Sequence, residues 1–508
     1  MQTAHRVIKN TGFLYAKMGI TMFISLYTTR LILNALGTSD FGVFNVVGGT
    51  IAMLGFLNAA MAGATQRFMS YSEGEGDKEK QKKIFNVSFI LHFGIAIAVG
   101  IVLLVAGYLF FNGVLNIAPE RIYAAKVVYA SLIVSTIFTV MTVPYDAVLN
   151  AHENMLYYSI VGVVESLLKL GAALVIVHYS SGDKLILYSI FMACIPLVII
   201  TIMRIYCHKH YKECVIEPKR YWDKGLMKEM TSFAGWNLLG TSGGLIGNYG
   251  SGIIANHFFG TIVNAAIGIV VQANGQLMAF SNNMLKALNP VIVKKEGCND
   301  RQSMLHYSLL GSKISFSLLA FFSIPIFVEA PYIFKLWLKV IPMWTIVFIR
   351  IQLIRTLLEQ LTITFGTSLA AQGDIKGLNI TTIISNLIPL PILFILFELN
   401  FPPYWMLIIP IIFMVCFGTV FKLYYACKLC DLSIKDLFTV VIYPSFILFV
   451  VTISVASIPH YIMDENFHRF ILSTFLSVIT FCIVYYLLTS KKEKQIFIEI
   501  YSKIKSAF

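Results

Sequence analysis

The chain has 508 residues and a formal net charge of +13, yet only 13% of its residues are charged and 57% are hydrophobic. An ordinary soluble domain has roughly 25% charged residues, so this composition leaves too little polar surface for a water-soluble globule. Apolar runs recur from end to end, which predicts an all-α polytopic membrane protein and excludes a β-barrel of short alternating strands. The positive charge lies in short segments between these runs, so it predicts membrane orientation and no nucleic-acid partner.

Fourteen candidate spans follow one another along the chain. They begin near Thr11, Phe41, Ile84, Ala124, Asn154, Leu185, Lys228, Ile262, Ser303, Met343, Lys376, Pro403, Lys435 and Phe467. With the N-terminus placed in the cytoplasm, the inner segments hold 25 Lys and Arg residues, Lys422 among them, and the outer loops hold five, Arg469 among them. This asymmetry follows the positive-inside rule and predicts that both termini are cytoplasmic.

Two stretches of the chain match each other at a constant spacing of 223 residues. Gly12, Gly37, Thr38, Met61, Glu73, Gly74, Asp77 and Lys78 correspond to Gly235, Gly260, Thr261, Met284, Glu296, Gly297, Asp300 and Arg301. A weaker echo at a spacing of 220 relates Leu149, Ala151, Ser166 and Leu167 to Leu369, Ala371, Asn386 and Leu387. A constant spacing over several spans indicates a duplicated half, as in two-lobed transporters.

The longest inner connection, near the middle of the chain, separates the two copies. We therefore predict an N-lobe of spans 1–6 (residues 1–207), a cytoplasmic inter-lobe loop (208–227) and a C-lobe of spans 7–12 (228–430). Spans 13 and 14 (431–490) and a basic cytoplasmic tail (491–508) follow. An even number of spans precedes the second copy, which predicts a parallel repeat.

Charged residues inside the spans are few, and each needs a wet cavity or a partner, because a charge at the bilayer centre costs roughly 2.5–3.5 kcal/mol. The cations are Lys17, Arg30, Lys169, Lys286, Lys313, Arg350 and Arg355, and the acids are Glu165 and Glu359. Glu165 with Lys169, and Arg355 with Glu359, are spaced four apart and can meet on one helix face. Structural neutralisation and a functional role are both open for these pairs, and Lys313 is interpreted as structural.

The excess of cations predicts an anionic cargo. Arginine suits phosphate and pyrophosphate, because its planar guanidinium stays charged and donates two parallel hydrogen bonds. We take Lys17, Arg30, Lys169, Lys286, Arg350 and Arg355 as candidate substrate-binding residues, and Glu165 and Glu359 as candidates for ion coupling. No sequence pattern predicts a catalytic centre, a metal site, a cofactor or an ATP-binding motif, so transport would draw on an ion gradient or on the gradient of the cargo itself.

Several short motifs of the chain are similar to those of a known transporter family. They are Asn10-Thr11, Arg30 through Leu36-Gly37, Asp40-Phe41-Gly42, Phe56-Leu57-Asn58, Gln66-Arg67-Phe68, Pro144-Tyr145, Ala151 to Met155, and Ala370 to Asp374. With them the chain resembles the polysaccharide-transporter branch of the multidrug/oligosaccharidyl-lipid/polysaccharide (MOP) exporter superfamily, the Wzx-type O-antigen and capsule flippases. The resemblance covers essentially the whole chain.

This resemblance implies two parallel six-helix lobes in a V-shaped, MATE-like arrangement with two extra C-terminal helices. The implied activity is transfer of an undecaprenyl-pyrophosphate-linked oligosaccharide from the inner to the outer leaflet of the bacterial plasma membrane by alternating access. Coupling to H+ or Na+, through Glu165 or Glu359, and partnership with the polymerase and glycosyltransferases of the same pathway are further implications. Lipopolysaccharide, capsule and exopolysaccharide pathways are not distinguished.

Three alternatives are weighed against this interpretation. A multidrug cation antiporter of the same superfamily would require unpaired acidic residues, whereas both acids here have a cation four positions away. A membrane polysaccharide polymerase or ligase would require a large outer loop, and all outer loops are short. A sugar or nucleotide transporter of another two-lobed fold would favour twelve spans rather than fourteen.

Overall fold

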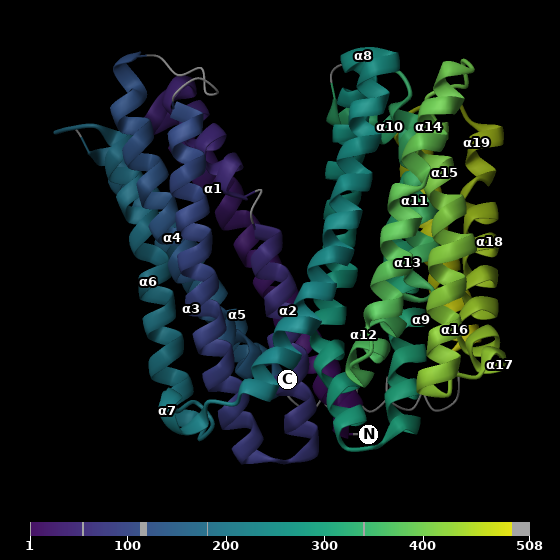
Figure 1. Ribbon diagram of the computed structural model, residues 1–508. Helices are drawn as coiled ribbons and strands as arrows, with labels where there is room; N and C mark the ends of the chain where they lie inside the picture. The colour runs from purple at the N-terminus through teal and green to yellow at the C-terminus, as the bar shows by residue number, and fades with distance from the viewer. Residues whose placement is uncertain (1, 53–54, 112–118, 180, 339–340, 490–508) are drawn as a thin grey trace, which may run out of the picture. The chain divides into compact units, whose positions relative to one another are not determined.

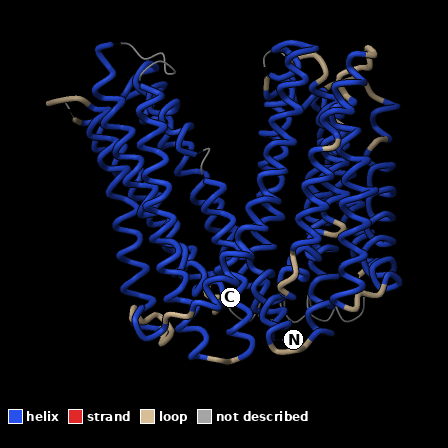
Figure 2. The backbone as a smooth tube through the Cα atoms, in the orientation of Figure 1, coloured by secondary structure: helices blue, strands red, loops and turns tan. Residues whose placement is uncertain are grey.

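The computed structural model describes residues 2–52, 55–111, 119–179, 181–338 and 341–489. Within these ranges the chain is helical with short loops and contains no strand (Figure 2). It divides into two compact units, which we call the N-unit (Asn10–Leu238) and the C-unit (Met1–Lys9 with Leu239–Phe508). The predicted all-α class is confirmed.

The N-unit is built around one central helix, α4 (Ile122–Ala151), which packs against four others in the same unit (Figure 1). Its neighbours are α2 (Gly55–Glu75), α3 (Lys78–Leu109), α5 (Met155–His178) and α6 (Lys184–His210). The unit also holds most of α1 (Gln2–Ala52), the short helices η2 (Pro119–Arg121) and α7 (Pro218–Tyr221), and the start of α8 (Lys224–Gly297).

The C-unit is centred on α9 (Arg301–Val328), which contacts elements from both the repeat and the extra C-terminal region. Its repeat portion contains the rest of α8, α10 (Ala330–Trp337), α11 (Thr345–Gln360), α12 (Ile363–Gln372), α13 (Lys376–Leu387), α14 (Pro389–Glu398), α15 (Trp405–Phe413), the π-helix η3 (Met414–Thr419) and α16 (Val420–Cys430). The C-terminal region adds α17 (Ile434–Asp436), the π-helix η4 (Leu437–Ile442), α18 (Tyr443–Ala456), α19 (Ile458–Ile462) and α20 (Phe467–Leu488). Helices α18 and α20 pack against each other and against α9.

Ten helical segments of the described chain are long and apolar enough to cross a membrane. They match the predicted spans 1, 3–6, 9 and 11–14. The other four predicted spans are also helical: the end of α1 with α2, the two halves of α8, and α11 with α12. They carry more glycine or charge, as with Arg350, Arg355 and Glu359 in α11. About fourteen transmembrane helices therefore account for the chain.

Both long helices, α1 and α8, contain a sharp bend at a glycine. Gly37 has φ 77° and ψ 170°, and Gly260 has φ 72° and ψ −166°. A residue with a Cβ is disfavoured at positive φ, so glycine lets two antiparallel spans follow each other with almost no loop. Gly37 and Gly260 are 223 residues apart, the spacing of the predicted duplication.

The turns after these helix pairs repeat in the same way. Gly76 and Asn299, again 223 apart, both have positive φ, and so do Glu153 and Gly373, which are 220 apart. Asp77 caps α3 by accepting a hydrogen bond from the Lys80 backbone NH, and Asp300 caps α9 through that of Ser303. Aspartate at this position satisfies an otherwise unpaired NH of the first helical turn. The duplication predicted from the sequence is thus also visible in the backbone.

A row of glycines in the C-unit brings α8 against α13. A Cβ on Gly243 would lie 3.1 Å from the Ile383 Cα, and one on Gly247 would lie 2.9 Å from the Asn386 carbonyl oxygen. These glycines are therefore required for close approach of the two backbones, as small residues are in other membrane helix pairs.

Candidate functional site

Lys17, on α1, lies in a slot that glycine makes on α5. A Cβ placed on Gly162 would come within 2.2 Å of the Lys17 Cε and 2.6 Å of its Nζ, so a larger residue there would displace the end of the Lys17 side chain from this position. The ammonium group lies 4.1 Å from the centre of the Tyr158 ring. A cation over an aromatic face is attracted by the ring quadrupole. The two helices thus hold Lys17 in a defined position.

The predicted pair Glu165–Lys169 lies further along the same helix, α5. The Lys169 Nζ is 2.6 Å from the Glu165 Oε1, and both side chains are about two-fifths exposed in the structure. The Tyr158 hydroxyl faces Lys17 and the carboxylates of Asp146 and Glu165. Lys17, Glu165 and Lys169 therefore belong to one polar region of the N-unit, which we call the α1–α5 cluster together with Tyr158 and Asp146.

Arg30 lies on α1 outside this cluster. It is exposed, and within the described part of the chain it has no hydrogen-bonding or ion-pairing partner. Thirteen residues of helix separate it from Lys17, which corresponds to about 20 Å. Arg30 is therefore a second cation of α1, free to contact a ligand or the lipid headgroups.

In the C-unit, Glu359 has a cation from another helix as its neighbour, not the cation expected on its own helix. Its carboxylate interacts electrostatically with Lys422 of α16, whose Nζ is also 3.5 Å from the Thr362 hydroxyl. Arg355 and Glu359, both described, do not form an ion pair, although their spacing of four would allow one. The sequence places Lys422 in an inner segment between spans, whereas in the structure it lies within α16, eight residues before the end of that helix.

Arg350 serves as an anchor for the end of α9. Its Nε donates to the Phe327 carbonyl at 3.0 Å and its Nη2 to the Val328 carbonyl at 3.4 Å. Cations are favoured at helix C-termini, where carbonyl groups lack intrahelical partners. The predicted role of Arg350 in substrate binding must therefore compete with this structural role.

A buried ion pair lies next to that helix end. The side chains of Glu329 and Arg469 are almost completely buried, with the Arg469 Nη2 2.9 Å from the Glu329 Oε2. Ser473 donates a further hydrogen bond to Glu329 at 2.9 Å. Arg469 was expected in an outer loop, and it lies instead in the first turn of α20, where it fastens the last span to the rest of the C-unit.

The remaining predicted cations occupy packed positions. Lys286 is half-buried on the second half of α8, and Lys313 is buried on α9. The α1–α5 cluster is the place where the structure brings several of the predicted site residues together. Sequence reasoning missed Tyr158, Gly162 and Asp146 in the N-unit and Lys422 in the C-unit. A glycine four residues after a tyrosine on the helix that carries Glu165 was the available signal.

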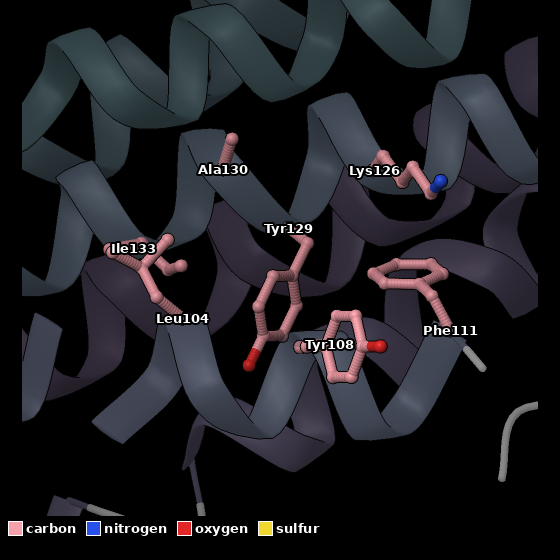
Figure 3. A pocket seen from close by; sticks show the side chains of 8 residues that line it. Leu104, Tyr108, Phe111, Lys126, Tyr129, Ala130 and Ile133 are labelled. Atoms are coloured by element: carbon pink, nitrogen blue, oxygen red, sulfur yellow. The ribbon is translucent and has the colours of Figure 1, made fainter. Parts of the chain in front are cut away.

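A separate pocket of about 420 Å3 lies between α3 and α4 of the N-unit (Figure 3). Tyr108 and Leu104, both largely exposed, line it together with Tyr129 and Lys126. The Tyr129 hydroxyl donates to the Leu103 carbonyl at 2.7 Å, and a Cβ on Gly107 would clash with its ring. This pocket contains none of the predicted site residues.

Comparison with known proteins gives a family and a fold. The model of the family described as "Polysaccharide biosynthesis protein" matches residues 7–296, which is more than half of the chain. No curated protein matches the sequence.

Solved structures with the same fold are transporters. A multidrug resistance MATE family transporter of the MOP superfamily, in an outward-facing conformation, aligns with a TM-score of 0.70 at 14% identity, covering 82% of this chain and 95% of that one. A MATE protein in the straight conformation aligns with a TM-score of 0.67 at 15% identity, covering 82% and 95%. A MOP superfamily transporter from Pyrococcus furiosus, described as having a binding pocket of reverse polarity, aligns with a TM-score of 0.70 at 14% identity, covering 84% and 96%.

Proposed function

Since this chain belongs to the polysaccharide biosynthesis protein family and has the fold of MATE and other MOP transporters, we propose that it is a flippase for lipid-linked oligosaccharides. Its cargo is an undecaprenyl-pyrophosphate-linked repeat unit, carried from the inner to the outer leaflet of the bacterial plasma membrane by alternating access. The product would supply assembly of a surface polysaccharide such as O-antigen, capsule or exopolysaccharide. The polymerase and glycosyltransferases of that pathway are the proposed partners.

The observation that carries this proposal is the packing of Lys17 between Gly162 and Tyr158 of α5. Its aliphatic stem crosses Gly162 and its ammonium lies over Tyr158, so the charge is presented at a fixed place within a membrane-spanning helix. Helix α1 carries a second cation, Arg30, and no acidic residue between Lys17 and Gly37. Cations within a span favour an anionic group, and pyrophosphate is the anionic group of this cargo.

The paired acids are consistent with the same proposal. Glu165 bonds to Lys169, and Glu359 interacts electrostatically with Lys422, so each carboxylate has a cation in its surroundings. A transporter for organic cations would need such carboxylates available to its substrate. Both acids stay as candidates for H+ or Na+ coupling, because a carboxylate that exchanges a cation partner during transport can bind an ion in one state only.

The proposal is tested by reconstituting the full-length protein in liposomes and measuring the movement of a pyrophosphate-linked lipid oligosaccharide between leaflets. The double variant Lys17→Gln with Arg30→Gln should lose most of the movement while keeping the wild-type thermal stability. Lys335→Gln removes a cation that is about three-quarters exposed on α10 and serves as the matched control.

Three outcomes separate the alternatives. Movement that the double variant loses and the control keeps supports the flippase with a cationic site on α1 that includes Lys17, Arg30 or both. Movement that is equal in all three proteins keeps the activity but contradicts this site. No movement by the wild type, together with extrusion of a cationic dye, would replace the flippase by the multidrug antiporter.

A further inference from the structure

Four segments of the N-unit meet at the predicted cytoplasmic end of α2. Glu73, in the last turn of α2, receives a hydrogen bond from the Gln81 side chain at 2.7 Å and pairs with the Lys78 ammonium at 2.9 Å. The turn between α4 and α5 brings His152 to the same place, and the connection after α6 brings Glu213. Side chains from segments up to 140 residues apart therefore form one charged cluster.

His152 lies between two carboxylates. Its Nδ1 is 3.4 Å from the Glu73 Oε1, and its Nε2 is hydrogen-bonded to the Glu213 Oε1. The Tyr211 ring stacks on the imidazole with 4.4 Å between ring centres. A neutral imidazole has one NH and can donate to one carboxylate only, whereas the protonated ring donates to both. Both carboxylates around His152 can therefore accept a hydrogen bond only when both ring nitrogens carry a proton.

Glu213 needs this partner because its side chain is only 2% exposed. Burial by itself raises the pKa of a carboxyl group, but the hydrogen bond and the charge of His152 outweigh burial and hold the Glu213 pKa below its usual value. The other charged groups facing His152 are Glu73 from α2 and Lys78 from α3, and Glu153 is its neighbour in the turn. Loss of the proton from His152 would leave a buried carboxylate without a cation bonded to it.

The C-unit contains a corresponding cluster without a histidine. Glu296 and Arg301 correspond to Glu73 and Lys78 at a spacing of 223, and Gln372 corresponds to His152 at a spacing of 220. Arg301 lies 2.9 Å from the Glu296 carboxylate and 2.8 Å from that of Asp431, so it bridges two acids as His152 does. Gln372 donates to Glu296 at 2.6 Å. The glutamine side chain has no titratable proton, whereas histidine can bind and release one near neutral pH.

We propose that His152, with Glu73 and Glu213, is a proton-binding site that clamps the connection 211–217 to the end of α2. With the proton bound, the α4–α5 turn, the end of α2 and this connection are joined by two charge-assisted contacts. When the proton leaves, the contact to one carboxylate is lost and the connection is held by its other contacts. Those include the Asn86 side chain, which donates to the Val215 carbonyl at 2.7 Å and accepts from the Glu217 NH at 2.9 Å.

The proposal has a direct physical test that does not depend on transport. Amide hydrogen exchange of residues 211–217 is measured by mass spectrometry on the full-length protein in lipid nanodiscs at pH 6 and pH 8, after correction for the intrinsic exchange rates. In the wild type the protection should fall roughly ten-fold at the higher pH, the factor expected when one charge-assisted hydrogen bond is lost. His152→Gln, which gives the N-unit the residue found in the C-unit, should show equal protection at both pH values.

Two further variants make the result specific. His210→Gln removes an exposed histidine at the end of α6 that stacks on Tyr206, and it should keep the wild-type pH dependence. Glu213→Gln removes one of the two carboxylates and should abolish the dependence even if His152→Gln fails to fold. Equal protection of the wild type at both pH values, or the same fall in the wild type and in Glu213→Gln, would overturn the proposal.

Discussion

The Lys17 side chain occupies the space that the missing Cβ of Gly162 leaves on α5. Gly162→Ala should therefore push the ammonium off the Tyr158 ring without altering any charge. A cation–π contact contributes about 0.5–1 kcal/mol, so the half-saturating concentration of a pyrophosphate-linked lipid should rise about two- to five-fold in the proteoliposome assay. Gly171→Ala, on the same helix but with open space around the added methyl group, should behave as wild type. Equal effects of the two substitutions would show that Lys17 is not held by this slot.

The packing of α8 on α13 can be tested with two glycines that are three residues apart. Gly247→Ala places a methyl group 2.9 Å from a backbone oxygen of α13, and overpacking of this kind costs typically 1–3 kcal/mol. Gly244→Ala meets nothing within 4 Å and should be neutral or stabilising, since alanine favours a helix by roughly 0.5–1 kcal/mol over glycine. Thermal unfolding in detergent should thus show a lower Tm for the first variant alone. A Tm for Gly247→Ala at or above the wild-type value would contradict the close approach.

The buried pair Glu329–Arg469 should respond very differently to single and double substitution. Arg469→Met alone leaves the Glu329 carboxylate buried with no cation bonded to it, and removal of one partner of a buried pair costs about 3–5 kcal/mol. The double variant Glu329→Leu with Arg469→Met leaves no buried charge and should recover much of that loss. The comparison of the two Tm values measures this difference, and a double variant less stable than the single one would argue that the pair itself stabilises the docking of α20.

Acid should weaken the N-unit through Glu213. Its pKa is lower in the folded protein than in the unfolded chain, so its contribution to stability is present above the unfolded pKa of about 4.3 and is lost as the pH falls through the folded value. The wild type should therefore lose more stability than Glu213→Gln when the pH is lowered from 5 towards 3. Glu217→Gln, which removes a half-exposed carboxylate four residues away, is the matched control and should follow the wild type. Parallel melting curves for all three proteins would contradict this assignment.

The sequence allows the helices, the duplication and contacts within one helix to be predicted, because each depends on local periodicity or on constant spacing. Glu165 and Lys169 meet as their spacing of four predicts. Arg355 and Glu359 have the same spacing and form no ion pair, and Glu359 instead interacts electrostatically with Lys422 from another helix. Such tertiary neighbours leave no periodic signal in a single sequence.

The misplacement of Lys422 and Arg469 has a second physical cause. Each lies near the boundary of an apolar run, where hydropathy does not say whether a cation ends a helix or continues it. The π-helix η3 lies immediately before α16 and adds a residue to the turn, so the face that Lys422 presents does not follow from the usual period of 3.6. The sequence does not predict burial of Glu329 for a related reason, since a carboxylate between two helices is typical of an exposed loop.

One glycine of α8 corresponds in position to a charged residue of α1. Adding 223 to 17 gives 240, so the position of Lys17 is held in the second copy by Gly240, where the space is filled by Asn379 of α13. The first copy has a bulky charged side chain on its first helix opposite a glycine of α5, while the second copy has the glycine on its first helix opposite the larger residue of α13. The two halves are therefore not equivalent. A protein made of two copies of the second half would keep the glycine bend between its first two helices, but it would have no ammonium group at this position.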